Sequence, residues 1–127
     1  MTIRDLTAYA NAAVDWAILD GCFAGRIKPT DIDGCVERNG QFLVLEAKPS
    51  GKALSRGQEI TLTRLAACSP SLVLVFWGHP PDEPVTQMRE CWRGIWRDHP
   101  NPCLEVLRER SAAWFKWADT QRPGGVT

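Results

Sequence analysis

Apolar and polar residues alternate most clearly over residues 32–48, on both sides of the dipeptide Asn39-Gly40. This dipeptide favours a two-residue type I′ turn, because both central positions of that turn require a positive φ. The pattern therefore predicts a β-hairpin whose register is set by the turn. Counting outward from the turn gives the facing pairs Arg38–Gln41, Glu37–Phe42, Val36–Leu43, Cys35–Val44, Gly34–Leu45, Asp33–Glu46 and Asp31–Lys48.

Side chains alternate between the two faces of a strand, so this hairpin has one apolar and one charged face. The face expected in the core consists of Ile32, Val36, Leu43, Leu45 and Ala47. The charged face consists of Asp31, Asp33, Glu46 and Lys48. Directly opposed residues hold their Cβ atoms about 4.5–5.5 Å apart, where like charges destabilise a sheet. A divalent cation between Asp33 and Glu46 would offset this repulsion, since Mg²⁺ is typically bound by one or two carboxylates, waters and phosphate oxygens.

Lys48 follows Glu46 by two residues on the charged face. Its ammonium group would lie beside the ion, where it can orient a water molecule or neutralise charge on a phosphate. These residue types in this arrangement predict a site for phosphodiester hydrolysis. The alternative is the solvated side of a half-buried sheet, on which Asp31 and Lys48 form a surface salt bridge worth under about 1 kcal/mol.

Asp33 and the run Glu46-Ala47-Lys48 at the end of an apolar strand resemble the PD-(D/E)XK nuclease superfamily. Their spacing is similar to that of archaeal Holliday junction resolvases, and the run Pro29–Asp33 resembles small phage and VRR-type nucleases. The PD dipeptide itself is matched loosely, as Pro29-Thr30-Asp31 or Ile32-Asp33. The resemblance implies a Mg²⁺- or Mn²⁺-dependent nuclease. In it, Asp33, Glu46 and the carbonyl of Ala47 bind the metal, and Lys48 positions the nucleophilic water.

The same resemblance implies roles for residues outside the hairpin. In resolvase-like members an acid of the first helix completes the metal site, and either Asp15 or Asp20 could do so here. A polar residue on the helix after the hairpin faces the site in many of these families, and Gln58 is at the matching position. Lys52 and Arg56, close to a glycine-containing loop, are candidates for phosphate contacts. The alternative roles are a solvated carboxylate for Asp15 and Asp20, a helix cap for Gln58, and a surface cation for Lys52 and Arg56.

The remaining elements follow from periodicity and from capping signals. Before the hairpin we expect a helix over residues 4–20, ended by Gly21, and a short strand over 24–28. After the hairpin we expect a helix from the capping box Ser55/Gln58 to about Cys68 and a buried strand over 71–77 that is parallel to the Glu46 strand. An edge strand over 85–92 and a helix from Asn101-Pro102 to about residue 119 complete the chain. With the resemblance, these elements predict an α/β domain over residues 1–127. Its restriction-endonuclease-like αβββαβ core of mixed sheet and flanking helices covers about 5–77, and an added C-terminal elaboration covers about 85–119.

Composition limits the functional classes. Fifteen lysines and arginines balance fifteen aspartates and glutamates in 127 residues, so the chain lacks the basic character of a protein that coats duplex DNA. Five scattered cysteines without a C-x-x-C pair indicate reduced thiols in a cytoplasmic protein and make a zinc site unexpected. Neither a secretory signal nor a membrane span is expected.

These observations favour a small metal-dependent DNA endonuclease acting on branched or single-stranded DNA, of phage or bacterial origin, and able to form a homodimer. The alternative is a non-catalytic DNA- or protein-binding module on the same fold. A third possibility is a subunit of a larger complex that docks through its aromatic C-terminal helix. Three of the six tryptophans, Trp92, Trp96 and Trp117, are candidates for base stacking, for a dimer contact or for packing between the last helix and the sheet.

Overall fold

The computed structural model describes residues 15–123 of a chain that divides into two compact units, 1–31 and 32–127. In the smaller unit, described residues 15–31 contain one short 3₁₀ helix, η1 (Trp16–Leu19), and none of them is buried. Most of the helix expected over 4–20 lies outside the described residues, and its described end is 3₁₀ rather than α-helical. The strand expected over 24–28 is wrong. None of those residues is in a strand, and residues 24–26 form a bend and a turn, because Gly25 has a φ of 67°, which an extended strand does not allow.

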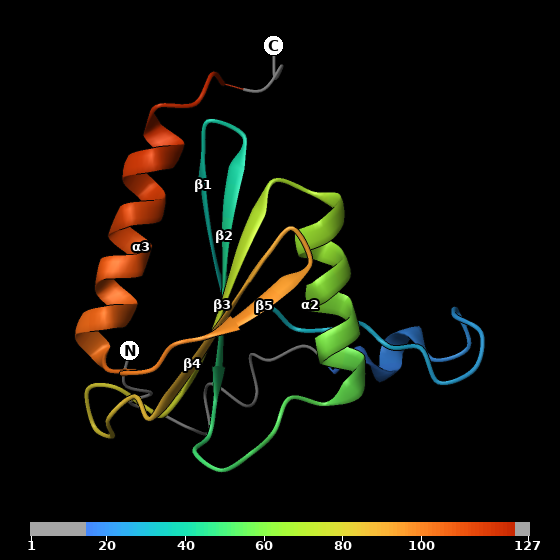
Figure 1. Ribbon diagram of the computed structural model, residues 1–127. Coiled ribbons are helices and arrows are strands. Elements are labelled where there is room, and N and C mark those ends of the chain that lie inside the picture. The colour runs from blue at the N-terminus through green and yellow to red at the C-terminus, as the bar shows by residue number, and fades with distance from the viewer. Residues whose placement is uncertain (1–14, 124–127) are drawn as a thin grey trace. The chain divides into compact units, whose positions relative to one another are not determined.

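The larger unit is a five-stranded mixed sheet with one helix on each face (Figure 1). Strands β2 and β3 are parallel, as expected from the helical crossover between them, and the other neighbouring strands are antiparallel. An α/β fold with a mixed sheet is therefore confirmed. The elements are β1 (Gly34–Arg38), β2 (Gln41–Lys48), α2 (Arg56–Cys68), β3 (Ser71–Trp77), β4 (Gln87–Trp92), β5 (Ile95–Asp98) and α3 (Leu104–Asp119), and the strand order is β1-β2-β3-β4-β5.

The β1–β2 hairpin has the predicted register, from Arg38–Gln41 to Gly34–Leu45. Asn39 and Gly40 have φ values of 52° and 81°, as a type I′ turn requires. The ladder ends at Gly34, however, so the expected pairs Asp33–Glu46 and Asp31–Lys48 lie beyond it.

The expectation that only the face of Leu43, Leu45 and Ala47 lies in the core is wrong for β2. Leu43 packs toward α3, but Val44 on the opposite face is equally buried and packs with α2. Both faces are covered because β2 is an interior strand with a helix on each side. Three residues expected in the core, Ile32, Val36 and Ala47, are exposed, since they belong to the edge strand or to the ends of the hairpin.

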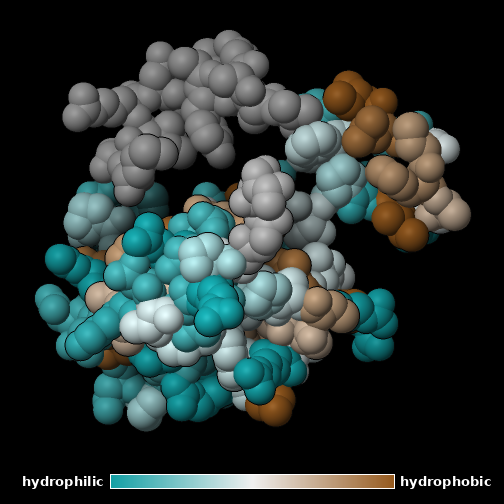
Figure 2. All heavy atoms as spheres, turned by 90° about the horizontal axis from the view of Figure 1, so that it is seen from above, coloured by the Kyte–Doolittle hydropathy of each residue, from teal (hydrophilic) through white to brown (hydrophobic). Residues whose placement is uncertain are grey.

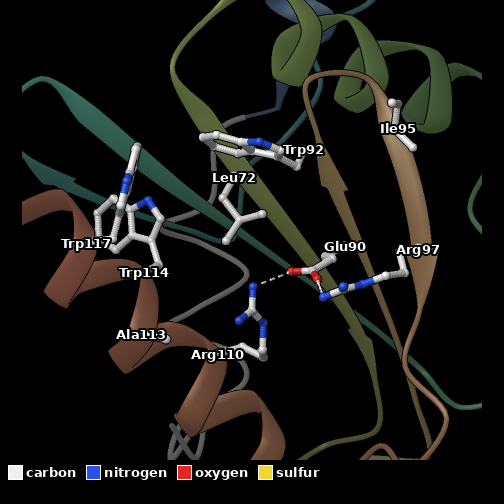
Figure 3. A pocket seen from close by; sticks show the side chains of 9 residues that line it. All are labelled: Leu72, Glu90, Trp92, Ile95, Arg97, Arg110, Ala113, Trp114 and Trp117. Atoms are coloured by element: carbon white, nitrogen blue, oxygen red, sulfur yellow. Dashed lines mark hydrogen bonds and ion pairs between the residues drawn. The ribbon is translucent and has the colours of Figure 1, made fainter.

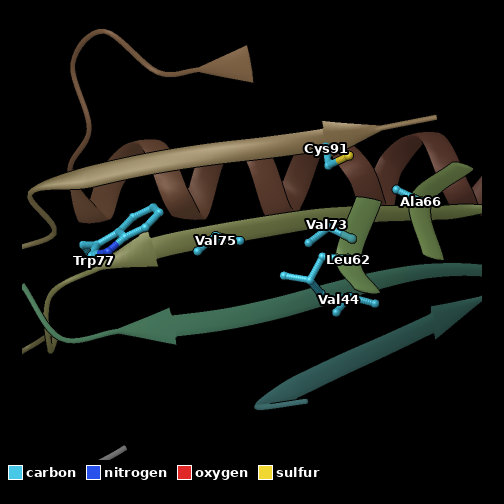
Figure 4. Packing of buried hydrophobic residues seen from close by; sticks show 7 residues of the cluster. All are labelled: Val44, Leu62, Ala66, Val73, Val75, Trp77 and Cys91. Atoms are coloured by element: carbon cyan, nitrogen blue, oxygen red, sulfur yellow. The ribbon is translucent and has the colours of Figure 1, made fainter. Parts of the chain in front are cut away.

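The face beneath α2 holds a core of strand and helix residues (Figure 4). The capping box predicted for α2 is present, with Ser55 as N-cap and Gln58 at the third helical position. Burial raises the pKa of the Cys91 thiol in this core, which keeps it protonated. The members of the core are Val44, Leu62, Ala66, Val73, Val75, Trp77 and Cys91.

The face beneath α3 holds a second core that includes Leu72, Leu74 and Trp114. Helix α3 ends at Asp119, as predicted, but it begins at Leu104 rather than at Pro102. Its N-cap is Cys103, whose extended backbone (φ −161°) keeps the preceding proline outside the helix. Seen from above, the surface is mostly hydrophilic over the larger body of the molecule (Figure 2).

Strand β5 is absent from the sequence prediction, and β4 is consequently an interior strand rather than the expected edge strand. The two strands are joined at Arg93-Gly94, whose φ values of 54° and 84° match those of Asn39-Gly40. Arginine is an uncommon residue at positive φ, so the dipeptide gives no turn signal. The positive φ of Arg93 therefore depends on the surrounding fold and not on the local sequence.

Replacing Gly94 by alanine should destabilise the larger unit by about 1–2 kcal/mol, because an L-residue at this φ is strained. The added Cβ would also lie 3.1 Å from the Cβ of Ala67 on α2. The matched control is Gly57→Ala in the first turn of α2, where nothing lies within 4 Å of the new methyl group. That change should be neutral or stabilising by up to about 1 kcal/mol. Urea unfolding measures both values, and equal stability of the two variants would contradict the strained turn.

Candidate functional site

The first turn of α2 lies over the C-terminal end of β2, where it brings Gln58 to Glu46 and Lys48. The Lys48 Nζ donates a hydrogen bond to Gln58 Oε1 at 3.0 Å, and Gln58 Nε2 lies 3.5 Å from Glu46 Oε1. An ammonium group can only donate and a carboxylate can only accept. The amide of Gln58 therefore has one orientation that satisfies both neighbours. Of the expected site residues, these three are brought together by direct contacts.

Gln58 also caps its own helix. Its Oε1 accepts the backbone N–H of Ser55 at 3.3 Å, and its own N–H donates to Ser55 Oγ at 3.1 Å. Capping and support of the site were alternative predictions for this residue, and the structure shows that its side chain makes both sets of contacts. The capping box fixes the Gln58 side chain, which in turn holds the Lys48 ammonium group in place.

Glu46 and Lys48 are buried, with 7% and 9% of their surfaces exposed. A solvated sheet face would leave both side chains in water, so their burial is unlike the predicted surface alternative. Burying a carboxylate and an ammonium group carries a desolvation penalty of several kcal/mol per ion before pairing offsets it. Each buried charged group therefore needs a polar partner, and Gln58 contacts both.

Asp33 lies next to this strand end, because its Oδ2 accepts the backbone N–H of Ala47 at 2.8 Å. This side-chain contact continues the hairpin where the backbone ladder has stopped at Gly34. In a strand, the N–H and C=O of one residue point to the same neighbour. The carbonyl of Ala47 therefore faces the edge on which the Asp33 carboxylate lies.

Two hydrogen bonds to backbone carbonyls fix the loop that follows β2. The N–H of Gly78 donates to the Lys48 carbonyl at 3.0 Å, and Trp77 Nε1 donates to the Lys52 carbonyl at 2.5 Å. Lys52 lines a hollow of about 300 Å³ together with Arg89. Arg56 does not line that hollow.

Arg56 lines a separate hollow of about 330 Å³ beside Glu59 and Arg64 on α2. The structure thus does not bring the two predicted phosphate contacts, Lys52 and Arg56, into one pocket.

The acids proposed from the first helix belong to the unit of residues 1–31. Asp15 caps η1 by accepting the N–H of Ala17 at 3.0 Å, and Asp31 accepts a hydrogen bond from Trp16 Nε1 at 2.9 Å. The part of Asp15 or Asp20 in a metal site stays a prediction.

The oxygen donors around the strand end match the chemistry of a hard cation. Two carboxylates, Asp33 and Glu46, and the Ala47 carbonyl are the ligand types that Mg²⁺ and Mn²⁺ accept. One Asp33 oxygen accepts the Ala47 N–H, and the other has no hydrogen-bond partner within residues 15–123. Within residues 15–123 no group of three or more His, Cys, Asp or Glu side chains forms a ready-made metal site. Any ion here would therefore need the carbonyl, waters or substrate oxygens as further ligands.

A second polar cluster, which the sequence analysis missed, lies on the opposite face of the sheet beneath α3. Glu90 is buried there and forms ion pairs with Arg97 and with Arg110, the latter at 3.0 Å. His99 Nε2 lies 3.6 Å from the same carboxylate. The cluster depends on the β4–β5 hairpin, which pairs Glu90 with Arg97, and β5 was not predicted.

Searches against protein-family models, curated proteins and solved structures found no match to this chain. In the described part of the chain, no helix is both long enough and apolar enough to cross a membrane.

Proposed function

We propose that this protein is a metal-dependent DNA endonuclease with a restriction-endonuclease-like core, related to the PD-(D/E)XK superfamily. The observation that carries the proposal is the Glu46–Gln58–Lys48 network at the end of β2, in which both charged residues are buried. Asp33 is tied to the same strand end through the Ala47 N–H. These residue types can support the hydrolysis of a phosphodiester with a bound metal ion.

In this mechanism Asp33, Glu46 and the Ala47 carbonyl would hold Mg²⁺ or Mn²⁺. When bound, the ion supplies Lewis-acid stabilisation of the charge on the transferring phosphoryl group. The Lys48 ammonium group donates hydrogen bonds to the attacking water or to a phosphate oxygen. Its contact with Gln58 is with a neutral amide, so this contact orients the ammonium group without neutralising its charge.

DNA is the proposed partner, in branched or single-stranded form. The chain has no net charge, so binding has to depend on local cations rather than on the field of the whole molecule. Lys52 and Arg89, which line one hollow beside the end of β2, are the proposed phosphate contacts. Homodimerisation would give two such sites, as cleavage of both strands at a junction requires.

A direct test combines metal binding with cleavage. Mn²⁺ at 100 times its dissociation constant should stabilise the protein by about 2.7 kcal/mol, seen as a rise in Tm, and should support nicking of branched DNA that EDTA abolishes. The test variant is Asp33→Asn, which keeps an oxygen for the Ala47 N–H but removes the negative charge of the side chain. It should fold normally, lose most of the Mn²⁺-dependent rise in Tm and cleave poorly. A protein that neither gains stability with Mn²⁺ nor cleaves any DNA would refute the proposal.

The second candidate is a binding module without catalysis on the same fold. It is favoured by the balanced charge and by the burial of Glu46 and Lys48, which a purely structural polar network would also show. Unchanged Tm in Mn²⁺ together with DNA binding that survives Asp33→Asn would support this candidate.

A further inference from the structure

A pocket of about 510 Å³ lies between α3 and the sheet face formed by β3, β4 and β5 (Figure 3). It is on the face opposite Glu46 and Lys48, because Leu72 and Trp114 of its wall belong to the core beneath α3. The volume falls in the range of pockets that hold small organic molecules, about 300–1,000 Å³. This pocket is therefore separate from the proposed nuclease site.

One end of the pocket is aromatic. Trp92 of β4 and Trp117 of α3 pack edge to face, with ring centroids 5.6 Å apart, and both keep more than a third of their surface exposed. Trp114 and Leu72 line the wall beside them (Figure 3). Packing between the last helix and the sheet, one of the predicted roles of these tryptophans, is thus confirmed for the Trp92–Trp117 pair. The exposed parts of these rings still offer flat apolar surface to a ligand.

The other end is charged. Two guanidinium groups, those of Arg97 and Arg110, meet the single carboxylate of Glu90, which leaves one positive charge in excess. The Arg97 side chain is 65% exposed and Arg110 is 35% exposed, whereas the Glu90 side chain is 6% exposed. The two arginine side chains are therefore more accessible to solvent than the carboxylate with which they pair. An anion that enters the pocket meets the cations before it meets Glu90.

Two buried donors at the pocket have no protein acceptor among the described residues. They are Trp114 Nε1 and Arg110 Nε. Trp114 is 5% exposed, so its N–H is shielded from bulk water. A buried donor left unsatisfied costs about 1–3 kcal/mol, and both donors belong to side chains that line the pocket.

We propose that this pocket binds a small planar aromatic carboxylate. The ring packs against Trp92 and Trp117, and the carboxylate accepts hydrogen bonds from the arginines, whose single excess charge it matches. Planar guanidinium groups suit carboxylate oxygens because they can donate two parallel hydrogen bonds. This inference does not depend on the proposed nuclease activity.

Isothermal titration calorimetry with 2-naphthoate and 2-naphthamide tests the proposal, since these probes share a ring and differ in charge. Naphthoate should bind at least about tenfold more tightly than naphthamide, a difference of about 1.4 kcal/mol. Arg97→Met should remove that difference by weakening naphthoate alone, and Trp117→Leu should weaken both probes. Arg108→Met, at an exposed arginine of α3 that does not line the pocket, is the matched control and should change neither.

Three results would overturn the proposal. They are no binding of either probe at millimolar concentration, equal affinity of the two probes, and naphthoate binding that Arg97→Met leaves unchanged. Arg97 is mostly exposed, so this variant should fold, and its Tm can be checked before the titration.

Discussion

Lys48→Met is expected to reduce metal-dependent DNA cleavage by about 10²–10³-fold, the usual effect of removing one preorganised donor from an active site. Methionine has nearly the same length as lysine and fills the same buried space, so the loss should come from the missing charge. Glu46→Gln should have the larger effect, because it removes the charge of a proposed metal ligand from the strand end. Cleavage of a fluorescent branched substrate under single-turnover conditions measures both.

The matched control for this experiment is Lys116→Met, an exposed lysine on α3. It loses the same charge at a distance from the site and should cleave at the normal rate. Circular dichroism and urea unfolding separate lost chemistry from lost fold, since Lys48→Met leaves Gln58 Oε1 without its donor at 3.0 Å. Normal cleavage by a folded Lys48→Met variant would show that the ammonium group takes no part in the reaction.

Part of this site could be predicted from the sequence, because the residue patterns that indicate it are close together along the chain. Asn39-Gly40 fixes the hairpin register by its φ requirements alone, and the register places Glu46 and Lys48 on one face of β2. The capping box at Ser55 and Gln58 depends on a spacing of three residues within one helical turn. Sequence alone therefore identified three residues that the fold brings into contact.

What the sequence did not reveal depends on contacts between distant segments. Side-chain alternation predicted a charged face with Glu46 and Lys48 and left a solvated surface as the alternative, whereas α2 covers that face and buries both residues. Asp33 was expected to oppose Glu46 in the ladder, but its carboxylate accepts the Ala47 N–H instead. The β4–β5 hairpin was missed because its turn has arginine at a positive φ, and the Glu90 cluster was missed with it.

Glu90→Ala is expected to destabilise the larger unit by about 3 kcal/mol, near the lower end of the 3–5 kcal/mol typical for breaking a buried ion pair. The value is at the lower end because Arg97 and Arg110 can turn partly into solvent once the carboxylate is gone. Most of the loss should persist in 1 M NaCl, since a buried pair is screened far less than a surface pair.

Asp98→Ala is the matched control for Glu90→Ala. It removes a carboxylate on β5 that pairs with Arg89 at 3.0 Å but is 77% exposed, so it should cost under about 1 kcal/mol and salt should reduce the effect. Urea unfolding at low and high salt measures both variants. If Glu90→Ala proves no more costly than Asp98→Ala, the buried carboxylate is not what holds β4, β5 and α3 together. The apolar packing of Trp92 against Trp117 would then have to supply that connection.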